Sequence, residues 1–121
     1  RGLIIMERIL LKSKIHRATV TDANLNYEGS ISMCPNIIDA AKLVEFEKVD
    51  IYNINNGERI STYVIKGKCE EVCLNGAAAR QVQPGDKVII ASYVHVDENS
   101  LNSFKPTLVY VNEKNTIIEV K

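Results

Sequence analysis

The fold of this chain is indicated most clearly by residues 49–65, which read VDIYNINNGERISTYVI. Two segments rich in β-branched and aromatic residues, 49–54 and 59–65, flank Asn55-Asn56-Gly57. An Asn-Gly pair tolerates the positive φ angles that a tight turn between antiparallel strands requires. The stretch therefore predicts a β-hairpin.

Outward from this hairpin, most of the chain has the pattern of short strands. Loose alternation or β-branched runs predict strands at residues 8–15, 18–21, 72–74, 87–96, 108–111 and 116–120. The turn Pro84-Gly85-Asp86 separates two of these segments. Many short strands favour a barrel or a sandwich, and a chain of 121 residues closes more easily into a barrel.

Two helical segments interrupt the strands. Residues 36–44 predict a helix with Asn36 as its N-cap. Residues 77–80 predict a single helical turn after Gly76. The expected fold class is therefore mainly β with short helices.

Composition excludes several classes of protein. The 15 basic and 15 acidic side chains cancel, so nothing favours binding to nucleic acid or to an anionic membrane. No apolar run approaches the roughly 20 residues that span a bilayer. We interpret residues 1–5 as an expression remnant without a signal peptide, Met6 as the native start, and residues 6–121 as one domain.

The cysteines indicate a reducing, cytoplasmic compartment. Cys34, Cys69 and Cys73 are odd in number and irregularly spaced, which argues against a disulfide framework. Cys69-x3-Cys73 is a conceivable pair of metal ligands, but no second Cys or His pair completes a site. Structural thiols are the favoured interpretation, and no metal is expected.

Common catalytic motifs do not account for a function. His16 and His95 lack the partners of a Ser-His-Asp triad, and the chain has no G-x-S-x-G elbow. Gly76-Ala77-Ala78-Ala79 lacks the lysine and the glycine spacing of a phosphate-binding loop. These patterns alone indicate no more than a small β domain.

Taken as a whole, the chain closely resembles the aspartate 1-decarboxylase family from Met6 to about Val111. Five motifs in matching order carry the resemblance: Lys14-Ile15-His16-Arg17, Tyr27-Glu28-Gly29-Ser30, Asn56-Gly57-Glu58-Arg59-Ile60-Ser61-Thr62-Tyr63, Leu74-Asn75-Gly76-Ala77-Ala78-Ala79 and Gly85-Asp86-Lys87-Val88-Ile89-Ile90-Ala91-Ser92-Tyr93. The resemblance implies a six-stranded double-psi β-barrel, a fold that spacing alone does not name. It also implies a covalent pyruvoyl cofactor made from Ser30, without metal or pyridoxal phosphate.

The chemistry of Gly29-Ser30 is compatible with such self-cleavage. Ser30 Oγ can attack the Gly29 carbonyl carbon, and elimination then leaves dehydroalanine, which water converts into pyruvoyl and ammonia. Glycine lacks Cβ, so we expect a strained backbone and an open carbonyl there. The products are residues 1–29 and 30–121. The dipeptide alone would be interpreted as a turn, and the surrounding motifs reverse that interpretation.

The resemblance also assigns roles around the cleaved bond. Arg59 matches an arginine that clamps a substrate carboxylate, and Lys14 matches a second electrostatic contact. Tyr63 matches the proton donor, and Thr62 matches a threonine that binds the oxyanion and the substrate. Without the motifs, Arg59 would be a solvated hairpin arginine, Lys14 a strand-end lysine and Tyr63 an amphipathic barrel residue.

A loop and three flanking residues complete the implied site. The loop resembles one that holds substrate through backbone N–H groups and an asparagine side chain, and it comprises Asn75, Gly76, Ala77 and Ala78. A plain turn into a helix is the alternative. Tyr27 and His16 are implied to support the cleaved terminus. Tyr52 stands at a pocket wall where some members carry tryptophan.

One conflict lies within the strand at 59–65. A period of two puts Arg59, Ser61 and Tyr63 on one face and Thr62 on the other. A β-bulge or an active site shared between subunits would reconcile these positions, and the sequence leaves both open.

The implied activity is decarboxylation of L-aspartate to β-alanine and carbon dioxide for pantothenate and coenzyme A synthesis. The pyruvoyl ketone would form a Schiff base with the substrate amine and accept the electrons left by decarboxylation. The implied assembly is a cytoplasmic homotetramer with active sites between subunits. Two alternatives stay open: a pyruvoyl decarboxylase of another small amino acid, and a non-catalytic double-psi barrel that binds a partner.

Overall fold

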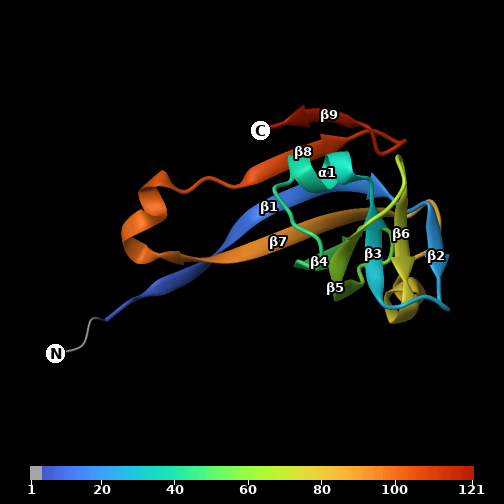
Figure 1. The fold of residues 1–121 in the computed structure, drawn as a ribbon, viewed down its shortest axis with the longest axis horizontal. Coiled ribbons are helices and arrows are strands. Elements are labelled where there is room, and N and C mark those ends of the chain that lie inside the picture. Colours follow the sequence, from blue (N-terminus) through green and yellow to red (C-terminus); the bar gives the residue numbers. More distant parts are fainter. Residues whose placement is uncertain (1–3) are drawn as a thin grey trace.

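The predicted hairpin is present in the computed structural model, which describes residues 4–121 (Figure 1). Strand β4 (Lys48–Asn53) pairs antiparallel with β5 (Arg59–Lys66). Gly57, in the turn between them, has φ 78°, which is the left-handed conformation that glycine adopts without strain. Residues 1–3 of the expected expression remnant lie outside the described residues.

The rest of the described chain is also mainly β. The other strands are β1 (Glu7–Thr19), β2 (Asp22–Asn24), β3 (Ser30–Met33), β6 (Val72–Asn75), β7 (Lys87–Asp97), β8 (Thr107–Val111) and β9 (Ile117–Val120). The helical segments are α1 (Pro35–Ala40) and the 3-10 helices η1 (Gly76–Gln81) and η2 (Glu98–Ser103). The mainly-β prediction with short helices is confirmed. β2, β3 and η2 were not predicted from the sequence; β2 and β3 contain no run of β-branched residues that would indicate a strand.

The strands form one sheet in the order β2-β6-β3-β5-β4-β7-β1-β8-β9. β1 continues almost directly into β2, and between them the Thr21 N–H donates to the Val72 carbonyl at 2.8 Å, at the start of β6. The sheet therefore returns to the chain segment from which it began and closes a barrel. The expected count of six strands is not confirmed, since residues 4–121 contain nine and β8 and β9 extend the sheet beyond β1.

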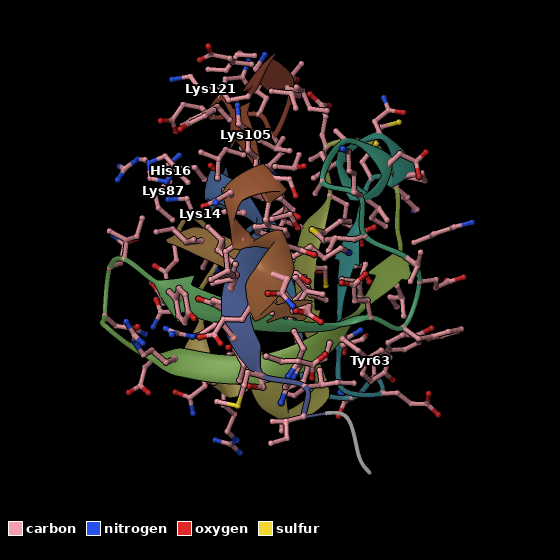
Figure 2. The ribbon with its side chains drawn as sticks, turned by 90° about the vertical axis from the view of Figure 1, so that its left-hand side faces the viewer. Lys14, His16, Tyr63, Lys87, Lys105 and Lys121 are labelled. Carbon is pink, nitrogen blue, oxygen red and sulfur yellow. The ribbon has the colours of Figure 1, made fainter. Side chains whose placement is uncertain are left out.

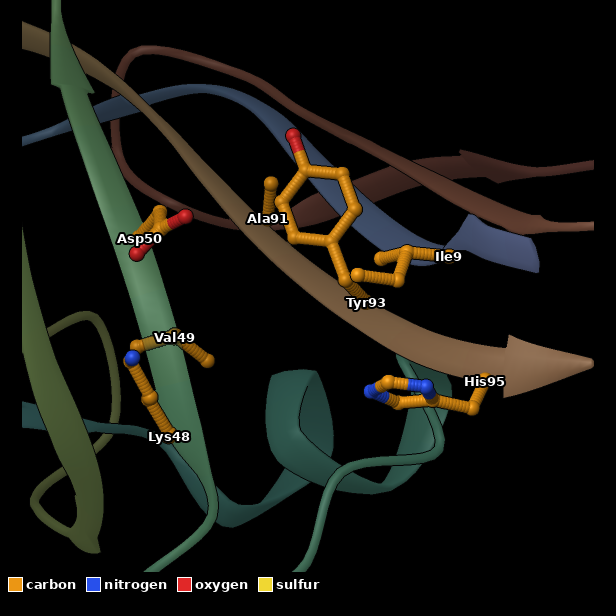
Figure 3. A pocket seen from close by; sticks show the side chains of 7 residues that line it. All are labelled: Ile9, Lys48, Val49, Asp50, Ala91, Tyr93 and His95. Atoms are coloured by element: carbon orange, nitrogen blue, oxygen red, sulfur yellow. The ribbon is translucent and has the colours of Figure 1, made fainter. Parts of the chain in front are cut away.

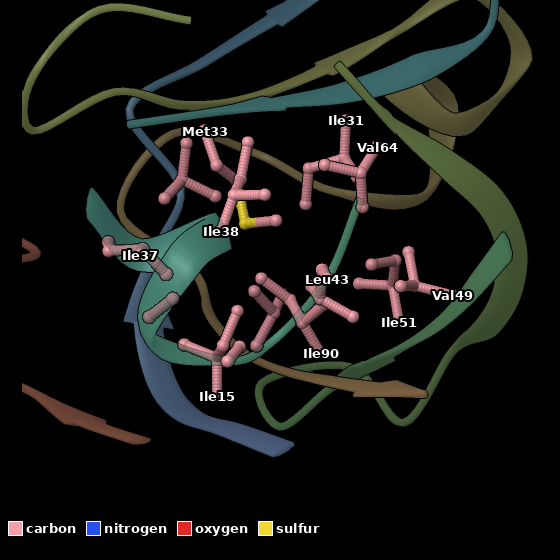
Figure 4. Close-up of a cluster of buried hydrophobic side chains, with 14 of the residues drawn as sticks. Ile15, Ile31, Met33, Ile37, Ile38, Leu43, Val49, Ile51, Val64 and Ile90 are labelled. Carbon is pink, nitrogen blue, oxygen red and sulfur yellow. The ribbon is translucent and has the colours of Figure 1, made fainter. Parts of the chain in front are cut away.

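Apolar side chains from most strands fill the inside of the barrel (Figure 4). Ile15, Ile51 and Ile90 from β1, β4 and β7 are at most 1% exposed. Helix α1 covers this core with Ile37 and Ile38. The barrel walls are thus held in fixed register, which is what positions polar groups at their ends.

Helix α1 differs from the predicted helix at 36–44. It begins at Pro35 with Cys34 as N-cap, and Asn36 does not cap it. Proline suits the first turn, where its missing N–H needs no partner. The helix ends early because Lys42 is left-handed, with φ 57°, and the Leu43 N–H bonds back to the Ile38 carbonyl at 2.9 Å.

A half-buried carboxylate ties the segment after α1 to the barrel wall. Glu47 Oε2 accepts from Lys12 Nζ at 2.8 Å and from Ser92 Oγ at 2.6 Å, while Oε1 accepts from the Val44 N–H at 3.0 Å. Burial alone would raise the pKa of Glu47, but these hydrogen bonds outweigh it and lower that pKa below its usual value. A lowered folded pKa contributes stability above the unfolded pKa, near 4.3, and loses it as pH falls.

We therefore expect Glu47→Gln to lower the free energy of unfolding by about 1 kcal/mol at pH 7 and by less at pH 4. Urea unfolding at the two pH values measures the difference. Glu45→Gln is the control, because Glu45 makes one long contact, with the Lys66 N–H at 3.4 Å. An equal loss at both pH values in Glu47→Gln would contradict the prediction.

Candidate active site

Ser30 is the first residue of β3, and its side chain is buried. Its exposed fraction is 1%. Its Oγ donates to the Glu28 carbonyl at 3.1 Å and accepts from Asn75 Nδ2 at 2.9 Å. Ser30 lies opposite Asn75 in the antiparallel β3–β6 pair, so the strand register brings the two side chains together. The hydroxyl beside the expected cleavage bond is thus held at both its donor and its acceptor positions.

Gly76 packs directly against the Gly29 backbone. Its φ is 63°, and a Cβ at this position would lie 2.6 Å from Gly29 N and 2.7 Å from Gly29 Cα. Gly29 itself does not have a positive φ, and a Cβ there would meet only Asn75 O at 4.0 Å. The strained glycine expected at 29 is therefore not present. The position that needs glycine is Gly76, on the neighbouring segment.

Gly29 opens onto a pocket of about 460 Å³ at one end of the barrel. The pocket is lined by Thr62 and Tyr63 from β5 and by Ala77 and Ala78 from η1. Asn75, which precedes η1, holds Ser30 behind Gly29. The structure thus brings together most residues that the resemblance implies for cleavage, the substrate loop and the proton donor.

Arg59 and Tyr52 face a neighbouring hollow beside this pocket. The Arg59 guanidinium lies 4.5 Å from the centre of the Tyr52 ring. The Tyr52 hydroxyl is 2.7 Å from that of Tyr93. Burial, together with the hydrogen bond between the Tyr52 and Tyr93 hydroxyls, raises the pKa of Tyr52 to about 12, so the phenol stays neutral under the guanidinium. Arg59 is an exposed cation on an aromatic base, outside the lining of the pocket at Gly29.

Lys14 and His16 lie on a different side of the chain from Tyr63 (Figure 2). The His16 ring packs edge-on against Tyr110 at 5.6 Å, and its Nδ1 has no hydrogen-bond partner among residues 4–121. Burial, with the nearby charges of Lys14 and Arg17, lowers the pKa of His16. Within one chain these residues do not meet the pocket at Gly29.

The conflict on β5 is not removed by a bulge. β5 pairs with β4 in unbroken register from Tyr63 opposite Lys48 to Arg59 opposite Tyr52. Thr62 and Tyr63 both reach the pocket at Gly29, whereas Arg59 faces the hollow beside it. Tyr27 is exposed near the same end, with its carbonyl beside Gly76.

A separate hollow of about 330 Å³ lies on the outer face of β1, β4 and β7 (Figure 3). Lys48, Asp50, Tyr93 and His95 line it together with apolar side chains. None of the residues that the sequence analysis assigned to the active site lines this hollow.

The cysteines do not form the metal pair that the sequence left open. Cys69 is exposed and lies beside Cys34, whereas Cys73 is buried and its Sγ donates to Asn75 Oδ1 at 3.3 Å. Among residues 4–121, no group of three or more His, Cys, Asp or Glu side chains is placed to hold a metal ion.

Two buried residues beside Ser30 were not found from the sequence. Asn75 Nδ2 also donates to Ser32 Oγ at 3.0 Å, and Cys73 contacts the other end of the same amide. The alternation of Ser30-Ile31-Ser32 places both hydroxyls on one face of a strand, which is the signal that would have indicated Ser32.

The family model described as aspartate decarboxylase matches residues 6–118. The chain belongs to the aspartate decarboxylase family. Among its relatives, the protein named aspartate 1-decarboxylase from Hydrogenobaculum sp. (strain Y04AAS1) is 64% identical over 96% of this chain and 93% of the relative. Those from Bdellovibrio bacteriovorus and Wolinella succinogenes are 61% and 57% identical, over 91% and 93% of this chain and 89% and 94% of the relatives.

Membership of the aspartate decarboxylase family confirms the resemblance found in the sequence, and with it the expected enzyme class, a carboxy-lyase. The family fold is a double-psi barrel, which agrees with the closed sheet described above. The match continues past Val111 into β9, so the family likeness extends further along the chain than the sequence analysis expected. Across residues 4–121, no helix is both long and apolar enough to cross a membrane.

Proposed function

We propose that this chain decarboxylates L-aspartate to β-alanine and carbon dioxide, after cleaving itself between Gly29 and Ser30. The observation that carries the proposal is the buried Ser30 hydroxyl, held by Asn75 directly behind a pocket that contains Gly29, Thr62 and Tyr63. The relatives named aspartate 1-decarboxylase support the substrate. The product would supply pantothenate and coenzyme A synthesis.

The cleavage begins at the Ser30 hydroxyl. Its Oγ attacks the Gly29 carbonyl carbon, the Gly29–Ser30 C–N bond breaks, and the hydroxyl proton ends on the freed nitrogen. Removal of the Ser30 Cα proton then expels Gly29 as a carboxylate from Cβ. Hydrolysis of the resulting dehydroalanine releases ammonia and leaves the pyruvoyl terminus of residues 30–121. Thr62 lines the pocket at Gly29 and is the proposed donor to the oxyanion.

The residues around Ser30 fit a pyruvoyl group at this position. Ser30 supplies its atoms at the start of β3, and Asn75 presents an amide N–H to them. When formed, the group supplies a carbonyl that takes up the electrons of the decarboxylated substrate. Ala77 and Ala78 leave room for the substrate beside the backbone, and Tyr63 is proposed to return a proton to the substrate Cα.

The separation of Arg59 and Lys14 from this pocket supports a site shared between subunits. Both cations are proposed to hold the aspartate carboxylates, yet within one chain neither lines the pocket at Gly29. A neighbouring copy that presents the side of its barrel with Lys14 to the pocket at Gly29 would complete the site. We therefore propose a homotetramer with inter-subunit active sites, in the cytoplasm, where the three free thiols would stay reduced.

Intact-mass measurement before and after warming tests the cleavage. We expect the 13.5 kDa chain to give two fragments split after Gly29, and the larger fragment to lack a free α-amine. Turnover of L-aspartate is then compared with that of L-glutamate. Equal or reversed preference would favour the alternative of another amino-acid substrate. A chain that stays whole without turnover would favour the non-catalytic barrel.

Tyr63→Phe is expected to separate the two reactions. The phenol hydroxyl is not needed for the attack of Ser30, so cleavage should proceed as in the wild type. Turnover of aspartate should fall by about 100-fold or more, which is the size expected for loss of a general acid. Ser103→Ala, which removes a hydroxyl on η2 that lines no part of the pocket at Gly29, is the control. Retained turnover in Tyr63→Phe would show that another group delivers the proton.

A further inference from the structure

Four polar side chains meet on one face of the β3–β6 pair. Ser30 lies opposite Asn75, and Ser32 lies opposite Cys73. We call these four residues the polar quartet. Their exposed fractions are between 1% and 7%, so the quartet is buried although it is polar. The residues between them, Ile31 and Leu74, point the other way into the apolar core.

The Asn75 amide is the centre of the quartet. The single Ser30 hydroxyl proton goes to the Glu28 carbonyl, so Ser30 Oγ accepts from Asn75 Nδ2. The second N–H of Nδ2 goes to Ser32 Oγ at 3.0 Å, and Oδ1 accepts from Cys73 Sγ at 3.3 Å. Both amide donors and the amide oxygen are therefore engaged in one arrangement.

This arrangement has one orientation. A rotation of the amide by half a turn would put Oδ1 against Ser30 Oγ and Nδ2 against the Cys73 thiol. The thiol favours the observed orientation because it donates, and burial, with the charges of Asp22 and Glu71, raises the pKa of Cys73 and keeps it protonated. Ser30 favours the same orientation because its proton is committed to the Glu28 carbonyl, and the N–H donated to Ser32 Oγ adds a hydrogen bond that holds the amide in place.

We propose that Ser32 and Cys73 are positioning residues for self-cleavage: they hold the Asn75 amide so that its N–H stays on Ser30 Oγ. Neither touches the Gly29–Ser30 bond, and both act through Asn75. With the amide turned, its oxygen would compete for the Ser30 proton and draw Oγ away from Gly29. This inference rests on the proposed function, since it assigns roles within that cleavage.

The test measures the rate of cleavage after Gly29 by intact mass in the full chain. Ser32→Ala and Cys73→Ala are expected to slow it by about tenfold, the effect of one lost hydrogen bond. Ser32→Thr and Cys73→Ser keep an acceptor and a donor, respectively, and should restore the rate to within about threefold. Should Ser32→Ala fail to fold, the two Cys73 variants make the same comparison from β6.

Two further variants distinguish a positioning role of Ser32 and Cys73 from a general effect on core packing. Ile31→Val removes a core methyl group beside Ser30 on the opposite face and should leave the rate unchanged. Asn75→Ala combined with Ser32→Ala should be no slower than Asn75→Ala alone, because Ser32 acts through the amide.

The outcomes separate this inference from the proposed function. A wild-type chain that never cleaves overturns both. If the wild type cleaves and Ser32→Ala cleaves equally fast, the positioning roles alone are overturned. The same holds if Ile31→Val slows cleavage as much as Ser32→Ala does. If the two substitutions slow cleavage additively in the Asn75→Ala and Ser32→Ala double variant, the claim that Ser32 acts through Asn75 is overturned.

Discussion

A Ser30→Ala chain is expected to stay whole at 13.5 kDa and to show no detectable aspartate turnover. The substitution removes Oγ, which is both the proposed nucleophile and the oxygen through which Gly29 later leaves. No other hydroxyl replaces it, because Ser32, the nearest on the same face, lies two residues along β3. Intact mass after prolonged warming and release of carbon dioxide from aspartate are the measurements.

The uncleaved chain should still fold. Losing Oγ leaves one N–H of the buried Asn75 amide without its acceptor, which we expect to cost about 1 kcal/mol in the free energy of unfolding. Ser103→Ala is the control, because Ser103 lies on η2, at the far end of β7 (Figure 1), and its hydroxyl donates to the nearby Ser100 carbonyl at 3.1 Å. That variant should cleave like the wild type. Cleavage after Gly29 in Ser30→Ala would refute the nucleophile assignment.

Short sequence patterns correctly predicted those elements whose structure is set by residues close together in the chain. The Asn56-Gly57 pair and the β-branched runs on either side identified the central hairpin, because turn geometry and side-chain alternation are both set within a few residues. The same reasoning found helix α1 but not its N-cap or its ends. There Pro35 and the left-handed Lys42 set the ends, and these depend on burying Leu43 against the barrel.

Much of the candidate site depends on contacts that are distant in sequence. Gly29 and Gly76 touch because β3 pairs with β6, and no spacing in the sequence indicates that pairing. The motif match still named Ser30, Asn75 and Tyr63, since a family pattern preserves residues that meet only in three dimensions. The motif match did not indicate which of these residues lie together in one subunit. The placement of Lys14 away from Tyr63 became visible only in the structure.

Gly76→Ala is expected to slow self-cleavage by about 100-fold or more. Its Cβ would lie 2.6 Å from Gly29 N and 2.9 Å from Tyr27 O, and all of the crowded atoms belong to backbone, which cannot rotate away. The 27–29 segment must therefore move by a sizeable fraction of an ångström. Misplacement of reacting atoms by about 1 Å can cost two orders of magnitude in rate, because the attack of Oγ on the Gly29 carbonyl requires close alignment.

A second glycine separates this crowding from backbone strain. Gly85 also has a positive φ, 96°, but a Cβ there would meet no heavy atom within 4 Å. Alanine at either position pays a left-handed penalty of about 1–2 kcal/mol, and at Gly76 the crowding adds to it. We therefore expect Gly85→Ala to be less stable in urea yet to cleave at the wild-type rate. Gly76→Ala should be less stable and should also cleave more slowly. Equal cleavage rates in the two variants would show that the Gly76 contact does not set the position of Gly29. Slower cleavage in Gly76→Ala alone, measured where both chains are folded, would show that Gly76, the first residue of η1, sets the position of Gly29.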